Sequence, residues 1–163
     1  MDVESFRWLL TDDGQDLLTD ASAPDAGDEL ALQAALRKRA TAARVAVALT
    51  QVELRRRAEP KFGDLAARMY FTRDGLEQAT RRSVATHRAG RLRAAATASL
   101  IDLGCGIGGD LIASAAAGIT TAGVDLDPVR VAVTEANLAA LDLPGAVVVA
   151  DATTVDTSPF DVA

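Results

Sequence analysis

The chain has 163 residues, of which 49% are hydrophobic and 25% charged, and its formal net charge is −6. This composition is typical of a globular protein, it excludes an intrinsically disordered chain, and no apolar run approaches the roughly 18 residues of a transmembrane helix. One cysteine excludes an internal disulfide, and one cysteine with one histidine argues against a Cys/His metal site, so we expect no metal. The acidic N-terminus lacks a secretion signal, and we therefore expect a cytoplasmic protein.

Charge is distributed unevenly along the chain. Residues 1–29 hold nine acids and one base, residues 30–98 hold fifteen bases and five acids, and residues 99–163 hold nine acids and one base. Because phosphate binding depends on local positive charge, the arginine-rich middle segment keeps RNA open as a partner. Two other interpretations stay open: a solvated helical face, and neutralisation of the acidic N-terminal segment within the protein.

Residues 1–96 are predicted to form an all-helical N-terminal module, basic from about residue 30. Two short helices over VESFRWLL and GQDLLTDA precede a loose connection at 22–28. A long helix is expected from Glu29 to Pro60, because strong helix formers dominate and apolar residues recur at helical spacing. A second is predicted over FGDLAARM, and a third runs from its N-cap Thr72 through GLEQATRRSVATHRAGRLRAA. Core packing rather than base stacking is expected of the aromatic residues Phe6, Trp8, Tyr70 and Phe71.

Residues 97–163 change to the alternation of strands and helices that is typical of the first half of a Rossmann-like α/β sheet. Strands are predicted over SLIDLG, TTAGVDLD and AVVVAD, with helices over GDLIASAAAG and DPVRVAVTEANLAALDL between them. Gly118 fits the C′ position of the first of these helices, and Asp127 fits the N-cap of the second. FDVA is expected to begin a fourth strand, and because the chain ends inside it, we expect a truncated domain.

A glycine-rich loop, IDLGCGIGGD, follows the first predicted strand. Gly104, Gly106 and Gly109 satisfy G-x-G-x-x-G, in which the glycines allow a tight turn and the close approach of a nucleotide. This pattern alone fits NAD as well as S-adenosylmethionine. Asp102 would repel a pyrophosphate but suits a ligand with a cationic ammonium and sulfonium. The loop with its preceding acid therefore favours S-adenosylmethionine.

Two further acids follow the next two predicted strands. Asp125 lies about twenty residues beyond the loop, where a carboxylate accepts hydrogen bonds from ribose hydroxyls. Asp151 follows the third strand, where it can accept the amino group of adenine. Asp110 has two open interpretations, a helix cap or a contact to the ligand ammonium. Cys105 is expected to be only a small side chain in a tight loop.

The acid-glycine loop and the three strand-end acids resemble those of the class I S-adenosylmethionine-dependent methyltransferases. The resemblance implies that the loop holds the methionine part, Asp125 the ribose and Asp151 the adenine. The residues expected to bind the cofactor are Asp102, Gly104, Cys105, Gly106, Gly108, Asp110, Asp125, Leu126, Asp151 and Ala152.

A narrower resemblance is to the THUMP-like and trimethylguanosine-synthase-type RNA methyltransferases. It rests on DLGCGIGGD, on GVDLDPVRVAVTEANLAAL with its Asn137, and on the segment from KFGDLAARMYF onward. This narrower resemblance implies methylation of RNA, at guanine N2, by a motif of the Asp/Asn-Pro-Pro type that is expected beyond Ala163. The catalytic residues are then unknown, and we expect the chain alone to be inactive. A small-molecule or protein methyltransferase, and a non-catalytic cofactor- or RNA-binding module, are the alternatives.

Overall fold

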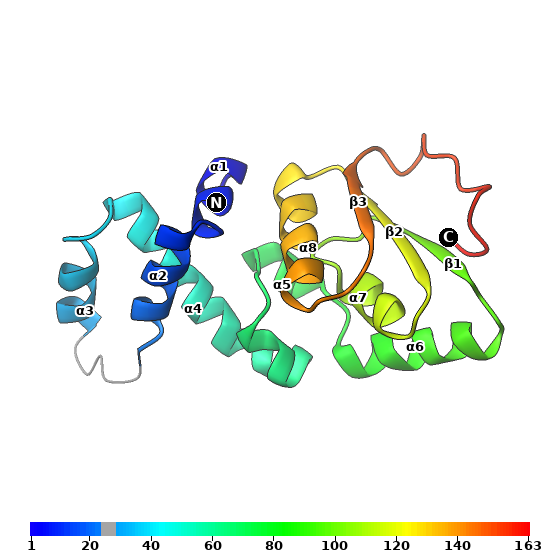
Figure 1. The fold of residues 1–163 in the computed structure, drawn as a ribbon, viewed down its shortest axis with the longest axis horizontal. Helices are drawn as coiled ribbons and strands as arrows, with labels where there is room; N and C mark the ends of the chain where they lie inside the picture. Colours follow the sequence, from blue (N-terminus) through cyan, green and yellow to red (C-terminus); the bar gives the residue numbers. More distant parts are fainter. Residues whose placement is uncertain (24–28) are drawn as a thin grey trace.

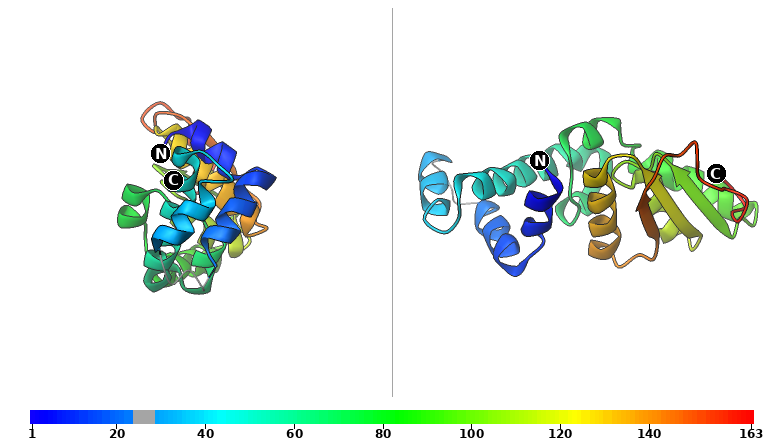
Figure 2. Two further views of the ribbon diagram at one scale, coloured as in Figure 1. Left: turned by 90° about the vertical axis from the view of Figure 1, so that its left-hand side faces the viewer. Right: turned by 90° about the horizontal axis from the view of Figure 1, so that it is seen from above.

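The computed structural model describes residues 1–23 and 29–163. The first four helices lie at one end of an elongated molecule, and the sheet lies at the other end (Figure 1, Figure 2). The predicted connection at 22–28 lies mostly outside the described residues. None of the helices in the described part is long and apolar enough to cross a bilayer.

The N-terminal helices begin at polar caps. They are α1 (Val3–Leu9), α2 (Asp12–Ala21), α3 (Glu29–Leu36) and α4 (Ala42–Phe62). Side chains of Asp2, Thr11 and Thr41 accept hydrogen bonds from backbone N–H groups in the first turns of α1, α2 and α4. Such caps satisfy N–H groups that have no partner within a helix. The two short helices predicted before residue 22 are confirmed.

The single helix predicted from Glu29 to Pro60 is wrong in two respects. The helix is interrupted between Leu36 and Ala42, where Thr41 caps α4 by accepting from the Arg44 N–H at 3.4 Å. It also continues beyond Pro60 and ends at Gly63, whose φ of 60° is a left-handed value that glycine adopts readily.

The next two predicted helices also differ from the structure. FGDLAARM forms a 3-10 helix, η1 (Gly63–Ala67), and the third predicted helix is split into α5 (Arg73–Gln78) and α6 (Arg82–Ala94). Thr72 is confirmed as the N-cap of α5, since its hydroxyl accepts from the Gly75 N–H at 3.0 Å.

The split after α5 has a tertiary cause. Lys61 Nζ donates to the carbonyl oxygens of Leu76 at 2.6 Å, Glu77 at 2.7 Å and Ala79 at 3.2 Å. This ammonium, which comes from α4, satisfies carbonyls at the end of α5 that have no partner within the helix. The local sequence of α5 carries no sign of this contact.

The second half of the chain forms a parallel three-stranded sheet in the order β1-β2-β3, as expected of a partial Rossmann-like α/β fold. Its elements are β1 (Ser99–Leu103), α7 (Gly109–Ala116), β2 (Thr120–Asp125), α8 (Pro128–Ala140) and β3 (Ala146–Val149). Gly118 has a φ of 77° after α7, and Asp127 caps α8 by accepting from the Val129 N–H. In place of the predicted fourth strand there is a single parallel bridge between Leu100 and Val162.

One buried cluster connects the helical end with the sheet end, and Tyr70 lies in it. The Phe6 ring packs edge-on against the Tyr70 ring with centroids 5.7 Å apart, and the Tyr70 hydroxyl donates to Gln15 at 3.0 Å. Phe6, Tyr70 and Phe71 are buried, as predicted, and Trp8 is partly buried against the same cluster. The division into modules at 1–96 and 97–163 stays a prediction, since apolar packing runs continuously across it.

Two buried amides hold the extended chain between η1 and α5. Gln51 on α4 donates to the Phe71 carbonyl at 2.7 Å and accepts from its N–H at 3.0 Å. Asn137 on α8 does the same for Tyr70, at 3.1 and 2.6 Å, and also donates to the Ile107 carbonyl at 3.0 Å. Both amides are completely buried, so these bonds replace strand partners that the extended segment lacks.

Replacing Asn137 with Leu should destabilise the protein by about 3 kcal/mol or more, because it leaves buried polar groups of Tyr70 and Ile107 without partners at about 1–3 kcal/mol each. Urea unfolding followed by circular dichroism measures this change. The matched control is Glu135→Gln on the exposed face of α8, which should stay within about 0.5 kcal/mol of the wild type. Equal stability of the two variants would contradict the role of Asn137.

Candidate ligand-binding site

Three glycines of the loop after β1 adopt left-handed conformations. The φ angles are 82° at Gly104, 59° at Gly106 and 85° at Gly108. A Cβ atom on Gly108 would lie 2.8 Å from Thr134 Cγ2, whereas nothing lies within 4 Å of the Cβ positions of Gly104 and Gly106. Helix packing therefore requires Gly108, and the backbone at the other two glycines is open to a ligand.

The loop is held rigidly by its neighbours. The N–H groups of Gly104 and Cys105 donate to the Val124 carbonyl at 2.8 and 2.9 Å. The Thr134 hydroxyl on α8 donates to the Gly106 carbonyl at 2.8 Å, and the Gly106 N–H donates to Asp125 Oδ2 at 3.0 Å. These bonds come from β2 and α8, so the loop geometry exists before any ligand binds.

Three of the predicted acids act on one another beside the loop. Burial, together with the carboxylates of Asp110 and Asp125, raises the pKa of Asp102 to about 6, and Arg88 opposes the shift. Asp125 is only 8% exposed, and its Oδ1 accepts from the Asp127 N–H at 2.9 Å. The site therefore concentrates negative charge that a cation would neutralise.

Asp110 ties the sheet to the helical segment. Its Oδ2 accepts from the Thr80 hydroxyl at 2.6 Å, and its Oδ1 pairs with Arg88 at 2.7 Å. The predicted alternatives for Asp110 were a cap of α7 and a contact to the ligand ammonium. These two bonds give it a further role, since they fix α6 and the turn before it against the N-terminus of α7.

A hollow of about 110 Å³ lies over the loop. Its lining includes Asp102, Gly106, Asp110 and Arg130, together with Gly75 and Thr80 from the α5 region. A Cβ atom on Gly75 would lie 2.4 Å from Ile107 Cγ2, which shows how closely α5 approaches the loop. The glycine loop and the α5 region therefore form opposite walls of the hollow.

The remaining predicted residues have differing surroundings. Cys105 is buried, and burial together with Asp102 and Asp125 raises the pKa of its thiol to about 12, which opposes a nucleophilic role. Leu126 is 69% exposed, and Ala152 is half-buried. Asp151 is exposed, and its Oδ1 accepts from the N–H and the hydroxyl of Thr153, which lowers its pKa.

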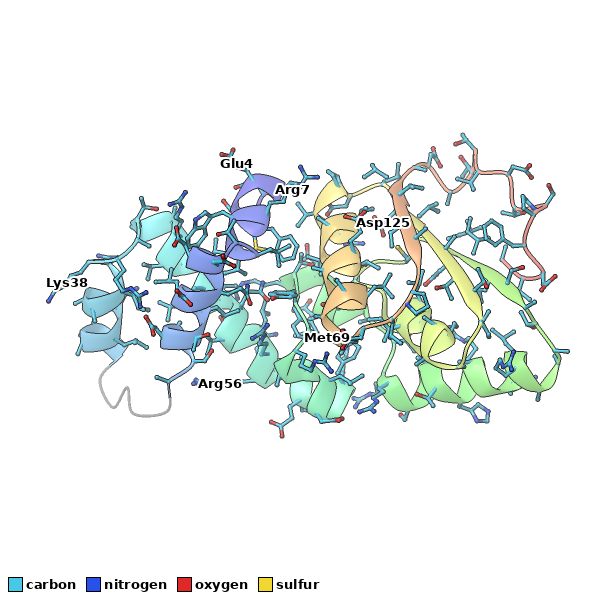
Figure 3. The ribbon with its side chains drawn as sticks, in the orientation of Figure 1. Glu4, Arg7, Lys38, Arg56, Met69 and Asp125 are labelled. Atoms are coloured by element: carbon cyan, nitrogen blue, oxygen red, sulfur yellow. The ribbon has the colours of Figure 1, made fainter. Side chains whose placement is uncertain are left out.

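The structure thus brings Asp102, Asp110 and Asp125 together, whereas the described contacts of Asp151 stay within its own turn. Sequence reasoning missed Thr80, Arg88 and Thr134, which reach the loop or its acids from the turn before α6, from α6 and from α8. No spacing rule connects these residues with the glycine motif, because only packing brings them close. The position of Asp125 on β2 beside β3 and α8 can be followed in Figure 3.

Comparisons with known proteins match different parts of the chain. Residues 2–58 match a family described as a domain of unknown function (DUF8688). Two relatives from Mycobacterium tuberculosis, of strains CDC 1551 / Oshkosh and ATCC 25618 / H37Rv, each carry the name uncharacterized S-adenosylmethionine-dependent methyltransferase. Each is 42% identical over 95 residues, which are 55% of this chain and 26% of the relative.

The chain therefore spans about a quarter of the length of the curated relatives that it matches. Among solved structures, it is similar to one described as "Conversion of a Disulfide Bond into a Thioacetal Group during Echinomycin Biosynthesis". The sequence identity is 30% and the TM-score 0.36, over 39% of this chain and 28% of that one.

Replacing Asp102 with Asn should raise the free energy of unfolding at pH 7.5 by about 2–3 kcal/mol. The pKa of Asp102 in the folded protein, about 6, exceeds its ordinary value of 3.8, so the stability it contributes is present below pH 3.8 and is lost as the pH rises through 6. Denaturant unfolding at pH 7.5 and pH 4 measures the gain, which should vanish at the lower pH.

The control for this variant is Asp156→Asn, since Asp156 is exposed and hydrogen bonds from Ser158 lower its pKa. We expect no gain in stability at pH 7.5 for this control. A folded Asp102→Asn variant that is no more stable than the wild type at pH 7.5 would contradict the predicted charge repulsion at the loop.

Proposed function

We propose that this chain binds S-adenosylmethionine at the glycine loop and that the protein is an S-adenosylmethionine-dependent methyltransferase. The observation that carries the proposal is the largely buried carboxylate of Asp102, which lines the hollow, is repelled by Asp110 and Asp125, and lies beside open glycine backbone. A cation relieves this repulsion, whereas a pyrophosphate would increase it. The names of the two mycobacterial relatives support the same donor.

The residues present fit the charges and the shape of this cofactor. Asp102 lines the hollow and has no described hydrogen-bond donor to satisfy its charge, so it would hold the methionine ammonium. Asp125 would accept from the ribose hydroxyls, because a carboxylate that already accepts two N–H bonds keeps free acceptor positions. The open backbone at Gly104 and Gly106 would lie against the ligand between them.

The nucleoside end would lie outside the hollow. Leu126 follows Asp125 directly and exposes an apolar side chain on which an adenine ring can pack. Asp151 uses Oδ1 for its contacts with Thr153, so its Oδ2 would be left to accept from the adenine amino group. The small side chain of Ala152 beside it leaves room for the ring.

When bound, S-adenosylmethionine supplies an electrophilic methyl group on its sulfonium. The residues of this chain would bind and orient the donor: Asp102 holds one end, Asp125 the other, and the loop backbone fixes the distance between them. Orientation of this kind lowers the barrier to an in-line attack, because the cost of aligning the reactants is met on binding. The carboxylates also place negative charge near the cationic donor.

We further propose RNA as the acceptor, with guanine N2 as the acceptor atom. This part of the proposal depends on the resemblance of the Cys-Gly-x-Gly-Gly loop and of Asn137 to the RNA methyltransferases, and on the positive charge of residues 30–98. The role of Asn137 in this structure is to hold Tyr70 and Ile107, so any effect on the acceptor would be indirect.

Replacing Asp125 with Ala should weaken the binding of S-adenosylmethionine about 10- to 100-fold, because one charge-assisted hydrogen bond contributes about 1.5–3 kcal/mol. Isothermal titration calorimetry on the 163-residue chain measures the affinity, and circular dichroism confirms the fold. Asp125→Asn keeps an acceptor for the Gly106 N–H of the loop and separates the loss of charge from a collapse of the loop. Unchanged affinity in folded Asp125→Ala would disprove the site.

Affinity for S-adenosylmethionine should fall as the pH drops below about 6, by up to tenfold per pH unit. Protonation of Asp102, whose pKa is about 6, removes the charge that would hold the ammonium. Calorimetry between pH 7.5 and 5 measures this dependence, and Asp102→Asn should bind weakly and show none of it. A pH dependence retained in Asp102→Asn would mean that another group holds the ammonium.

A further inference from the structure

We propose that helix α6 binds the phosphate backbone of an RNA acceptor along the side that carries Arg88 and Arg91. The inference rests on the proposed function, because it names where the acceptor of that same donor site would lie. It depends on three observations: the charge of α6, the pairing of bases elsewhere, and the position of α6 beside the acidic hollow.

Helix α6 is the most one-sidedly charged element of the middle segment. From Arg82 to Ala94 it contains four arginines and one histidine but no acid. Only Ala85 and Ala89 of this helix are buried, so the charged side chains project into solvent. Local positive charge of this kind is what phosphate binding requires.

Several bases elsewhere in residues 30–98 form ion pairs within the described part of the chain. Arg39 pairs with Asp20 of α2, Arg73 pairs with Glu53, and Arg57 pairs with Glu53 and Glu77. In α6, Arg82 pairs with Asp64 and Arg88 with Asp110, whereas the side chains of Arg91 and Arg93 have no hydrogen bond or ion pair with a described residue. The side chains of Arg37, Lys38, Arg44 and Arg56 also lack such partners, although Arg44 stacks over the Trp8 ring. They lie on or before α4 rather than beside the hollow, and Lys38 is at the far end of the molecule from the sheet (Figure 3).

The two sides of α6 face different surroundings. Arg88 reaches Asp110, which lines the hollow over the glycine loop, and Arg91 follows three residues later on the same side. Arg93 is five residues beyond Arg88, and helical spacing places it on the opposite side. Arg81 comes directly after Thr80, another residue of the hollow, so positive charge extends about 15 Å along the helix from this point.

The acidic hollow would bind the cationic cofactor, and the basic helix α6 would bind the RNA acceptor. The carboxylates of Asp102 and Asp110 repel phosphates, so a polyanionic acceptor cannot follow the cofactor into the hollow. Arginines on the adjacent helix would hold its backbone outside, where one base can reach the donor. A lipid surface fits α6 poorly, since Val84 is its one large apolar side chain that is clearly exposed.

Two single variants on the same helix test this proposal, namely Arg91→Ala and its matched control Arg93→Ala. The probe is a single-stranded RNA of about 20 nucleotides, and fluorescence anisotropy measures its binding to the 163-residue chain between about 50 and 200 mM salt. Arg91→Ala should lower the slope of log affinity against log salt by about 0.7, the value for one phosphate contact to a single strand. Arg93→Ala, like the remote Arg37→Ala/Lys38→Ala, should leave the slope unchanged.

Equal slopes for the Arg91 and Arg93 variants, or no binding of RNA by the wild type, would overturn the proposal. Equally tight, salt-dependent binding of polyglutamate would also overturn it, since it would indicate an acidic protein as the partner. Calorimetry with S-adenosylmethionine on the same variants separates the two proposals. Cofactor binding without RNA binding would refute the α6 surface alone, whereas RNA binding without cofactor binding would refute the donor site.

Discussion

The rest of the structure depends on the hydrogen bonds by which Gln51 and Asn137 bind the backbone of Phe71 and Tyr70. Each amide satisfies both the N–H and the carbonyl of one residue, from α4 on one side and α8 on the other. Asn137 also bonds to Ile107 of the glycine loop. Buried hydrogen bonds therefore connect the extended segment with α4, α8 and the glycine loop, and loss of either amide leaves its own backbone partners unsatisfied.

Helix α4 carries this arrangement across the boundary of the matched family. The family match ends at residue 58, but α4 continues to Phe62, and its last turn supplies Lys61 to the end of α5. Gly75 of α5 lies against Ile107 and forms a wall of the hollow. Helix α4 thus supports the candidate donor site indirectly, through its contact with the end of α5.

Charge is separated over a short distance on this surface. Asp102 and Asp110 line the hollow, Asp125 lies beside it, and α6 carries Arg88 and Arg91 on the side that faces it. Arg88 and Asp110 meet at the border and fix one region against the other. A cationic donor and a polyanionic acceptor require opposite fields, and this division provides both.

The sequence by itself determined the elements whose signals are local: the caps Thr72 and Asp127, the glycine loop, the parallel strands and the acids that follow them. At these positions the residue types and their spacing along the chain favour one backbone conformation, so the sequence pattern was sufficient to predict them. Tertiary structure decided the break between α5 and α6, the extended segment at Tyr70, and the contacts of Thr80, Arg88 and Thr134 with the site. These depend on side chains such as Lys61 and Asn137, tens of residues away, which reach their partners only after the helices pack.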